Sequence, residues 1–475
     1  MGFVRDVLVA SGFGATSKAD IAVLLLTIPD FLVNILVSGG LSVALIPEFS
    51  RYGKGLRSQC LFLQSSFLVG VLFALVAIIL INYSGELIGL FAPGLMPDTK
   101  ETLNRLLKIV MWLIPLTTLA GVSTAYLQAR GHFAVPAMGT MIFNFIVIIS
   151  LVLIYLEKVG LQLLAVFIVL GGVIRYGSHV IVLPKIRVPF KCFTWCLITY
   201  GIVSRYFHAV VAGGILLTLP VIARAIASFN GEGSVAIFNY ASRMVEFPLS
   251  VSVTVLSIGL FPLLASCFIK KENECHEMIE TTLHIVIIIA ISVSLPLIWY
   301  SQDIASLVFG WGQMQKSQTD TIGILLAIGM FALPFQGVSS VIVAIFNAKK
   351  DIKAMIPVNL IAVILFLTGG WIVGKRWGLS GLMLAIVITY ILVSVLQIYI
   401  LSKRHRINLM PILFNKKLVY SLFGMILIAF ALIFIVNGIM KESVFVEVLK
   451  ALLVFVAMLL VGVKSMGLYR WIAIK

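Results

Sequence analysis

Five charged side chains lie inside stretches of sequence that are otherwise apolar, and these are the residues best placed to do chemistry. Arg5 stands near the start of the chain, and Asp20 and Asp30 belong to the next apolar stretch. Arg243 and Glu246 lie three residues apart in a later one, which puts both side chains on one helical face. Ionisable groups in hydrocarbon are costly and normally face a partner or a water-filled cavity. Function should therefore be sought at these positions.

Arginine is the most informative of these residue types. Its guanidinium group cannot be neutralised by deprotonation, and its planar fork of donors matches phosphate oxygens in pairs. We therefore expect Arg5 and Arg243 to converge on one central cavity and to bind an anionic cargo there. A cation-coupled exporter would instead need unpaired carboxylates in that cavity.

Each of these charged residues also has a purely structural reading. Arg243 and Glu246 could form an ion pair that holds two helices together. Asp20 could cap the start of its own helix, and Asp30 could face a neighbouring helix rather than a lumen. These alternatives stay open on the sequence alone.

The composition requires that these residues be positioned by membrane helices. Of 475 residues, 61% are hydrophobic and 11% are charged, and the mean hydropathy is +1.13. Soluble domains are about 45–50% apolar and about 25% charged. Apolar runs of roughly 20 residues, the length that crosses a bilayer, recur from end to end. The fold class is therefore an all-α polytopic membrane protein with about fourteen transmembrane helices, the first of them truncated.

The expected spans follow from these runs. They are a partial first span ending near Phe13, then 20–49, 59–82, 106–128, 134–156, 160–183, 206–229, 234–266, 281–300, 321–347, 354–374, 379–402, 417–437 and 446–468. The arginines that remain inside spans are Arg5, Arg175, Arg224 and Arg243.

The distribution of basic residues predicts the orientation of the chain. Lys and Arg are roughly twice as frequent on one side of the spans as on the other, which makes that side cytoplasmic. The net charge of +16 is thus read as a topology signal, and no nucleic-acid partner is expected. We expect reduced thiols, no disulfide and no zinc site, because all five cysteines fall at or near cytoplasmic loops. They are Cys60, Cys192, Cys196, Cys267 and Cys275.

An internal repeat relates the two halves of the chain. Pro115 and Pro334 are separated by the same interval as Pro29 and Pro248, and the sequences around the first pair are similar. Six spans per repeat is an even number, so both halves enter the membrane in the same sense and form parallel lobes. The expected domains are an N-terminal lobe at 1–200, a C-terminal lobe at 201–410 and a final helix pair at 411–475. A short interfacial helix is expected between 84 and 105.

Three segments resemble a known family. They are GFVRDVLVASGFGATSKAD, LTIPDFLVNILVSGGLSVALIPEFSRY and NYASRMVEFPLSVSVTVLSIGLFPLLAS. They resemble the MurJ/MviN lipid II flippases, within the larger group of multidrug and polysaccharide exporters, and the resemblance covers the whole chain except its start. It implies fourteen spans, alternating access and export of an undecaprenyl-pyrophosphate-linked peptidoglycan precursor. It also implies a lipid-facing groove formed by the last two helices.

The resemblance also implies roles for individual residues. Arg5, Asp20, Arg243 and Glu246 match charged positions that the family uses in its cavity. By that resemblance the two arginines contact the pyrophosphate, while the carboxylates orient and neutralise them between cargoes. Together with Asp30 and Arg224 they make up the expected substrate-binding set.

The sequence departs from the family pattern in two places. The chain begins inside the family's first helix, which predicts a late start or a truncation. The family tends to place an arginine where this sequence has Val33, and a glutamate where it has Ser38. We hypothesise that Arg224, which matches no family position, restores the cavity charge.

These features predict a transporter rather than an enzyme. No HExxH, phosphate-loop or nucleophile motif is present in the sequence, and no cofactor or metal is expected. The expected partners are a lipid-linked pyrophosphate and membrane lipid, with cell-wall synthesis proteins as further candidates. The chain is expected to act as a monomer in the bacterial inner membrane. The alternatives are an exporter of another polyprenyl-linked oligosaccharide, a cation-coupled drug exporter, and a non-transporting scaffold for wall synthesis.

Overall fold

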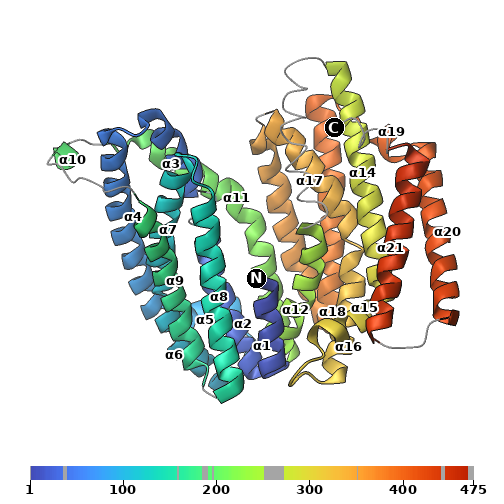
Figure 1. Cartoon of the computed structure of the whole chain (residues 1–475), viewed down its shortest axis with the longest axis horizontal. Helices are drawn as coiled ribbons and strands as arrows, with labels where there is room; N and C mark the ends of the chain where they lie inside the picture. Colours follow the sequence, from blue (N-terminus) through green and yellow to red (C-terminus); the bar gives the residue numbers. More distant parts are fainter. Residues whose placement is uncertain are drawn as a thin grey trace. The chain divides into compact units, whose positions relative to one another are not determined.

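The computed structural model describes residues 2–35, 40–157, 160–183, 191–194, 197–250, 272–349, 351–439 and 444–468. Every regular element within these ranges is a helix (Figure 1). The chain divides into two compact units, Met1–Ala236 and Ile237–Lys475. The all-helical, polytopic prediction is therefore confirmed.

The first unit is a bundle of helices, drawn from blue to green in Figure 1. Its helices are α1 (Gly2–Phe13), α2 (Ser17–Val33), α3 (Gly40–Tyr52), α4 (Leu56–Asn82), α5 (Ser84–Phe91), α6 (Pro97–Val110), α7 (Leu113–Gln128), α8 (Ala134–Glu157), α9 (Gln162–Val182), α10 (Lys191–Thr194), α11 (Tyr200–Ala227) and the short 3-10 helix η2 (Ser228–Asn230). Within the unit, α8 packs against α9, α7 packs against α4, α3 and α9, and α1 packs against α8.

Helix α12 (Ser234–Pro248) begins at the end of the first unit and leads into the second. The other helices of the second unit are α14 (Glu272–Trp299), α15 (Ser301–Phe309), α16 (Lys316–Met330), α17 (Leu333–Ala348), η4 (Ile352–Ala354), α18 (Met355–His405), α19 (Met410–Leu413), α20 (Lys416–Ile439) and α21 (Val444–Met466). Its core includes Ile345, Phe346 and Met425, all fully buried.

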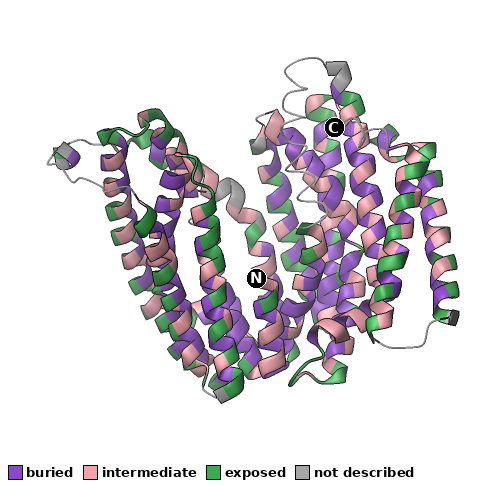
Figure 2. Cartoon of the chain, viewed as in Figure 1, coloured by how far each residue is buried: buried purple, intermediate pink, exposed green. Residues whose placement is uncertain are grey.

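Large apolar side chains cover the outside of many helices. Phe67 on α4 is 76% exposed and Phe434 on α20 is 84% exposed, and exposed residues recur along these helices in Figure 2. Soluble proteins rarely expose apolar patches of this extent, whereas lipid is their natural surrounding. Among the described residues, eight helices are long and apolar enough to cross a membrane, and the bent pair α16 and α17 makes a ninth. The total of about fourteen spans stays a prediction.

Several predicted span limits agree with the helices. The apolar run 20–49 was expected to be one span; it includes most of α2 and α3, and residues 36–39 between them lie outside the described residues, so this expectation stays a prediction. Residues 354–374 and 379–402 were expected as two spans, and the helix α18, which runs through both, agrees with that division. It breaks at Trp377 and Gly378, where the backbone leaves the helical region. Beyond residue 250, the predicted eighth span lies outside the described residues, as do Ser38, Cys196 and Cys267.

The short helix expected between 84 and 105 corresponds to α5, which is followed by α6. Helix α6 is amphipathic, since Leu103, Leu106 and Val110 are buried while the residues between them include exposed charges. It continues into α7, and together they form one long apolar stretch, Pro97–Gln128.

The expectation of five reduced thiols is wrong for one pair. Cys60 at the start of α4 and Cys192 in α10 form a disulfide across a sequence separation of 132 residues. Gln64, one turn after Cys60, holds the same segment, because its amide donates to the Cys192 carbonyl at 2.6 Å and accepts from the Leu197 backbone at 3.2 Å. Spacing along the chain could not reveal this pairing, because the fold alone brings the two cysteines together.

Candidate functional site

Arg5 occupies the interior of the first unit with two carboxylates close by. Its Nε lies 3.6 Å from Asp6 Oδ1, and its Nη1 lies 3.7 Å from Asp30 Oδ2. The side chains of Arg5 and Asp6 are 5% and 4% exposed, while that of Asp30 is 40% exposed. Both distances exceed the 2.7–2.9 Å typical of charge-assisted hydrogen bonds. Arg5 is thus a buried cation with two long ion pairs, and one of its partners, Asp30, is partly accessible.

Asp20 is also buried, but its carboxylate is fully engaged with the backbone of another helix. Its two oxygens accept from the Gly233 and Ala236 amides, each at 2.8 Å. These amides open α12, so Asp20 caps that helix and complements the positive end of its dipole. The capping alternative is therefore right in kind, although the helix that Asp20 caps is α12 and not its own.

A second carboxylate completes a reciprocal arrangement at the same place. Glu232, just before α12, accepts from the Ser17 amide at 2.9 Å, and this amide belongs to the first turn of α2. Hydrogen bonds from Ser17 lower the pKa of the Glu232 carboxyl below its ordinary value. Gly233 fits against this turn because it has a positive φ of 75° and lies so close to Ala15 that a Cβ would be 2.2 Å from its carbonyl oxygen. Glu232 thus caps α2, and Asp20 of α2 caps α12 in return.

Arg243 and Glu246 form an ion pair within α12. Arg243 Nη1 lies 2.9 Å from Glu246 Oε2, and the two side chains are 32% and 44% exposed. The spacing of three residues along a helix therefore predicted their contact correctly. This ion pair lies within one helix and leaves both side chains partly accessible. The predicted meeting of Arg5 with Arg243 stays a prediction.

Arg224 lies near the end of α11 with 9% of its surface exposed, so it is a buried cation of the first unit. Val33, where the family resemblance leads one to expect an arginine, is 8% exposed in the last turn of α2. Compensation of Val33 by Arg224 stays a hypothesis.

Arg175 is a residue that sequence reasoning placed inside a span but did not assign to the site. It lies in α9 and interacts electrostatically with Asp30, the same carboxylate that contacts Arg5. The sequence signal was present, because a permanent charge in the middle of an apolar helix needs an explanation. What the sequence could not show is that α9 brings this charge towards α2.

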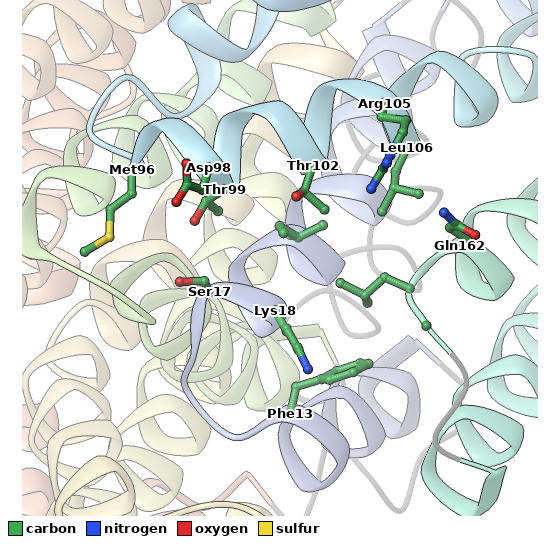
Figure 3. A pocket seen from close by; sticks show the side chains of 13 residues that line it. Phe13, Ser17, Lys18, Met96, Asp98, Thr99, Thr102, Arg105, Leu106 and Gln162 are labelled. Carbon is green, nitrogen blue, oxygen red and sulfur yellow. The ribbon is translucent and has the colours of Figure 1, made fainter.

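A separate pocket of about 680 Å³ opens in the first unit between α2, α6 and the start of α9 (Figure 3). Arg105 and Gln162 lie near one another at one end of the pocket, and Asp98 lies towards the other end. Lys18 and Arg105 are exposed, so their charges are solvated. None of the residues predicted to bind substrate lines this pocket, which therefore differs from the predicted cavity.

Comparison with known proteins agrees with this architecture. The sequence model of the family described as "Lipid II flippase MurJ" matches residues 9–455. The "Probable lipid II flippase MurJ" of Aquifex aeolicus is 27% identical over 360 residues, which cover 74% of this chain and 70% of the relative. The "Lipid II flippase MurJ" of Burkholderia cenocepacia is 24% identical over 420 residues, which cover 85% and 81%.

Solved structures show the same fold. A chain titled "Lipid II flippase MurJ, inward closed conformation" aligns with a TM-score of 0.81 and 21% identity, covering 98% of this chain and 96% of that one. An inward-facing multidrug resistance MATE family transporter of the MOP superfamily aligns with a TM-score of 0.71 and 15% identity, covering 85% and 93%. Both similarities concern the fold alone.

Proposed function

We propose that this chain, which belongs to the lipid II flippase MurJ family, carries an undecaprenyl-pyrophosphate-linked peptidoglycan precursor across the bacterial inner membrane by alternating access. The observation that supports this most directly is the buried guanidinium of Arg5, which loose ion pairs hold inside an apolar bundle. Such a group is costly to keep in hydrocarbon, and recognition of an anion gives a reason to keep it.

The geometry around Arg5 leaves room for a stronger ligand. Carboxylates at 3.6 and 3.7 Å neutralise the charge without occupying the donors at hydrogen-bond distance. A phosphate oxygen at 2.7–2.9 Å would form shorter, charge-assisted bonds, and the guanidinium fork can make two of them in parallel. In this proposal the cargo replaces weak internal contacts with stronger ones, so binding does not leave a bare charge.

In this proposal Arg243, with Glu246 as its partner, forms the second contact with the anionic cargo. Their ion pair at 2.9 Å is partly exposed on α12, so water and ligand can reach it. Glu246 acts as the resident counter-ion and gives way when phosphate binds Arg243. Asp20 has a different part, because both of its oxygens already bond to backbone amides; it positions the start of α12.

The family is one of flippases rather than of catalysts, and the proposed cycle makes and breaks no covalent bond. The cargo binds from the cytoplasmic leaflet, the helices rearrange about it, and it leaves on the outer side. In the proposal one copy of the chain suffices, and its ligands are the lipid-linked pyrophosphate and membrane lipid.

Rescue of a flippase-depleted bacterium tests the proposal. We expect the wild-type chain and Arg376→Gln, which changes an exposed arginine at the break in α18, to restore growth. Arg5→Gln and Arg243→Gln should fail although they reach the membrane in equal amount. Full rescue by Arg5→Gln would refute the proposal that Arg5 binds the cargo. Failure of the wild-type chain to rescue would favour an exporter of another polyprenyl-linked glycan or a scaffold.

A further inference from the structure

Helix α9 carries a cation at a position where the surrounding residues are apolar. Arg175 follows the stretch VFIVLGGVI and lies in the middle of α9. Its side chain is only partly accessible. Because arginine stays charged at any physiological pH, this side chain needs either a counter-ion or a ligand.

The face of α9 that carries Arg175 packs against α7 and α8. His179, one turn further along α9, is fully buried, and its Nδ1 lies 2.8 Å from the Ser123 hydroxyl on α7. Gly139 on α8 leaves room for this face of α9, since a Cβ there would lie 2.6 Å from His179 Nε2 and 3.3 Å from Arg175 Cγ. The stem of Arg175 therefore lies against α8. Its buried Nε has no hydrogen-bond partner among the described residues.

One carboxylate serves two guanidinium groups from different helices. Asp30, on α2, lies 3.7 Å from Arg5 Nη1 of α1 and also interacts electrostatically with Arg175 of α9. Its side chain is 40% exposed, whereas that of Arg5 is 5% exposed. Asp30 is thus the accessible, negatively charged member of the group, and it follows Pro29 in a helix that proline weakens.

We propose that Arg5 and Arg175 form a two-arginine phosphate site and that Asp30 is the resident anion which the phosphate displaces. This inference rests on the proposed function and names further residues of that same site. A pyrophosphate carries roughly two negative charges and several acceptor oxygens, so it can bridge two guanidinium groups that a single carboxylate holds only at long range. Asp6, also beside Arg5, stays in place as its buried counter-ion.

This assignment also accounts for the departure at Val33. The family resemblance leads one to expect an arginine from α2, and here α9 supplies the cation instead. Asp30 on α2 then links the two arginines across the bundle. Arg224 is not needed for this arrangement.

Binding of inorganic pyrophosphate to the purified full-length chain in lipid nanodiscs, measured by calorimetry, tests the inference. We expect Arg175→Gln to weaken binding about tenfold or more and to reduce its salt dependence, because one phosphate contact is lost. Arg175→Lys should recover part of the affinity. Arg376→Gln is the matched control and should bind as the wild type does.

Asp30 provides a readout that a structural role would not produce. If Asp30 competes with phosphate, Asp30→Asn should tighten binding severalfold, and the gain should vanish when it is combined with Arg175→Gln. Unchanged binding in Arg175→Gln, with binding lost in Arg5→Gln, would overturn this inference and leave the proposed function intact. Unchanged binding in Arg5→Gln as well, or no binding by the wild type, would overturn both. A poorly folded Arg175→Gln leaves Arg175→Lys and Asp30→Asn to decide the matter.

Discussion

Arg5, Asp20 and Glu246 are all ionisable side chains in apolar helices, yet their surroundings give them different tasks. Both oxygens of Asp20 accept hydrogen bonds from backbone amides at 2.8 Å, which gives this carboxylate a structural task. Glu246 shares one short contact with Arg243 and is 44% exposed. Arg5 is almost completely buried and has only long contacts. Distance and exposure therefore separate structural charges from those that can exchange partners.

Residue type and spacing along the chain predicted some of the partners of these charged side chains. The spacing of three residues on one helix was enough to pair Arg243 with Glu246, because helical geometry is local. The hydrogen bonds of Asp20 with Gly233 and Ala236 join residues far apart in the chain. So do the ion pair of Asp30 with Arg5 and its electrostatic interaction with Arg175. Only the packing of helices determines them, so the sequence could name the charged residues but not their partners.

The two remaining candidate arginines can be separated by substitution. We expect Arg243→Ala to abolish rescue of a flippase-depleted strain, because Glu246 would then be left without its cation and the cargo without a donor. If Arg224 restores the charge that Val33 lacks, Arg224→Ala should also reduce rescue strongly. Growth and membrane abundance are the measurements. Wild-type growth of Arg224→Ala beside complete loss in Arg243→Ala would refute the compensation by Arg224 and favour Arg175.

Among the elements, breaks in helices matter as much as helices. The expected spans 354–374 and 379–402 left a short gap between them, and the structure has non-helical backbone in that gap, at Trp377 and Gly378 inside α18. In the run 20–49 hydropathy alone set the predicted limits, and residues 36–39 between α2 and α3 lie outside the described residues. Hydropathy shows which stretches are long and apolar enough to cross the bilayer, but it does not show where a helix breaks.

Gly378 offers a test of this break. Its φ of 60° and ψ of −144° fall in a region that side chains with a Cβ essentially never adopt. Gly378→Ala should therefore lower the unfolding free energy by about 1–3 kcal/mol, seen as a lower melting temperature in detergent. Gly369→Ala is the control in the same helix, because a Cβ there meets nothing within 4 Å, and it should be neutral or slightly stabilising. Equal melting temperatures for both variants would contradict the argument.

The whole molecule is described by two compact units and an apolar exterior. Composition alone predicted a lipid-embedded chain, since a soluble protein needs a more charged surface. The similarity of the chain to MurJ relatives over most of its length agrees with the resemblance that three short segments showed. The disulfide between Cys60 and Cys192 was not predicted. The charge distribution placed both cysteines near cytoplasmic loops, where thiols are expected to be reduced, and the two residues are far apart in the chain.

Transport of an anionic lipid should respond to the membrane potential. Each elementary charge that crosses with the field gains about 2.3 kcal/mol per 100 mV. An inside-negative potential should therefore speed outward movement of a pyrophosphate-linked lipid in proteoliposomes, and a reversed potential should slow it. The initial rate of substrate appearance on the outer face is the measurement, with protein-free liposomes as the control. A rate that is the same at both polarities would show that net charge does not move in the limiting step.

The reciprocal caps between Ser17 and Glu232, and between Asp20 and the amides of Gly233 and Ala236, have one further consequence. Pulling these segments apart would strip two helices of their terminal acceptors at the same moment. Bulk water can replace such acceptors at little cost, while an oily environment cannot. Separation of the start of α2 from the start of α12 is therefore costly where lipid surrounds them and cheaper where water reaches them. We expect any such separation to begin on the side that is open to solvent.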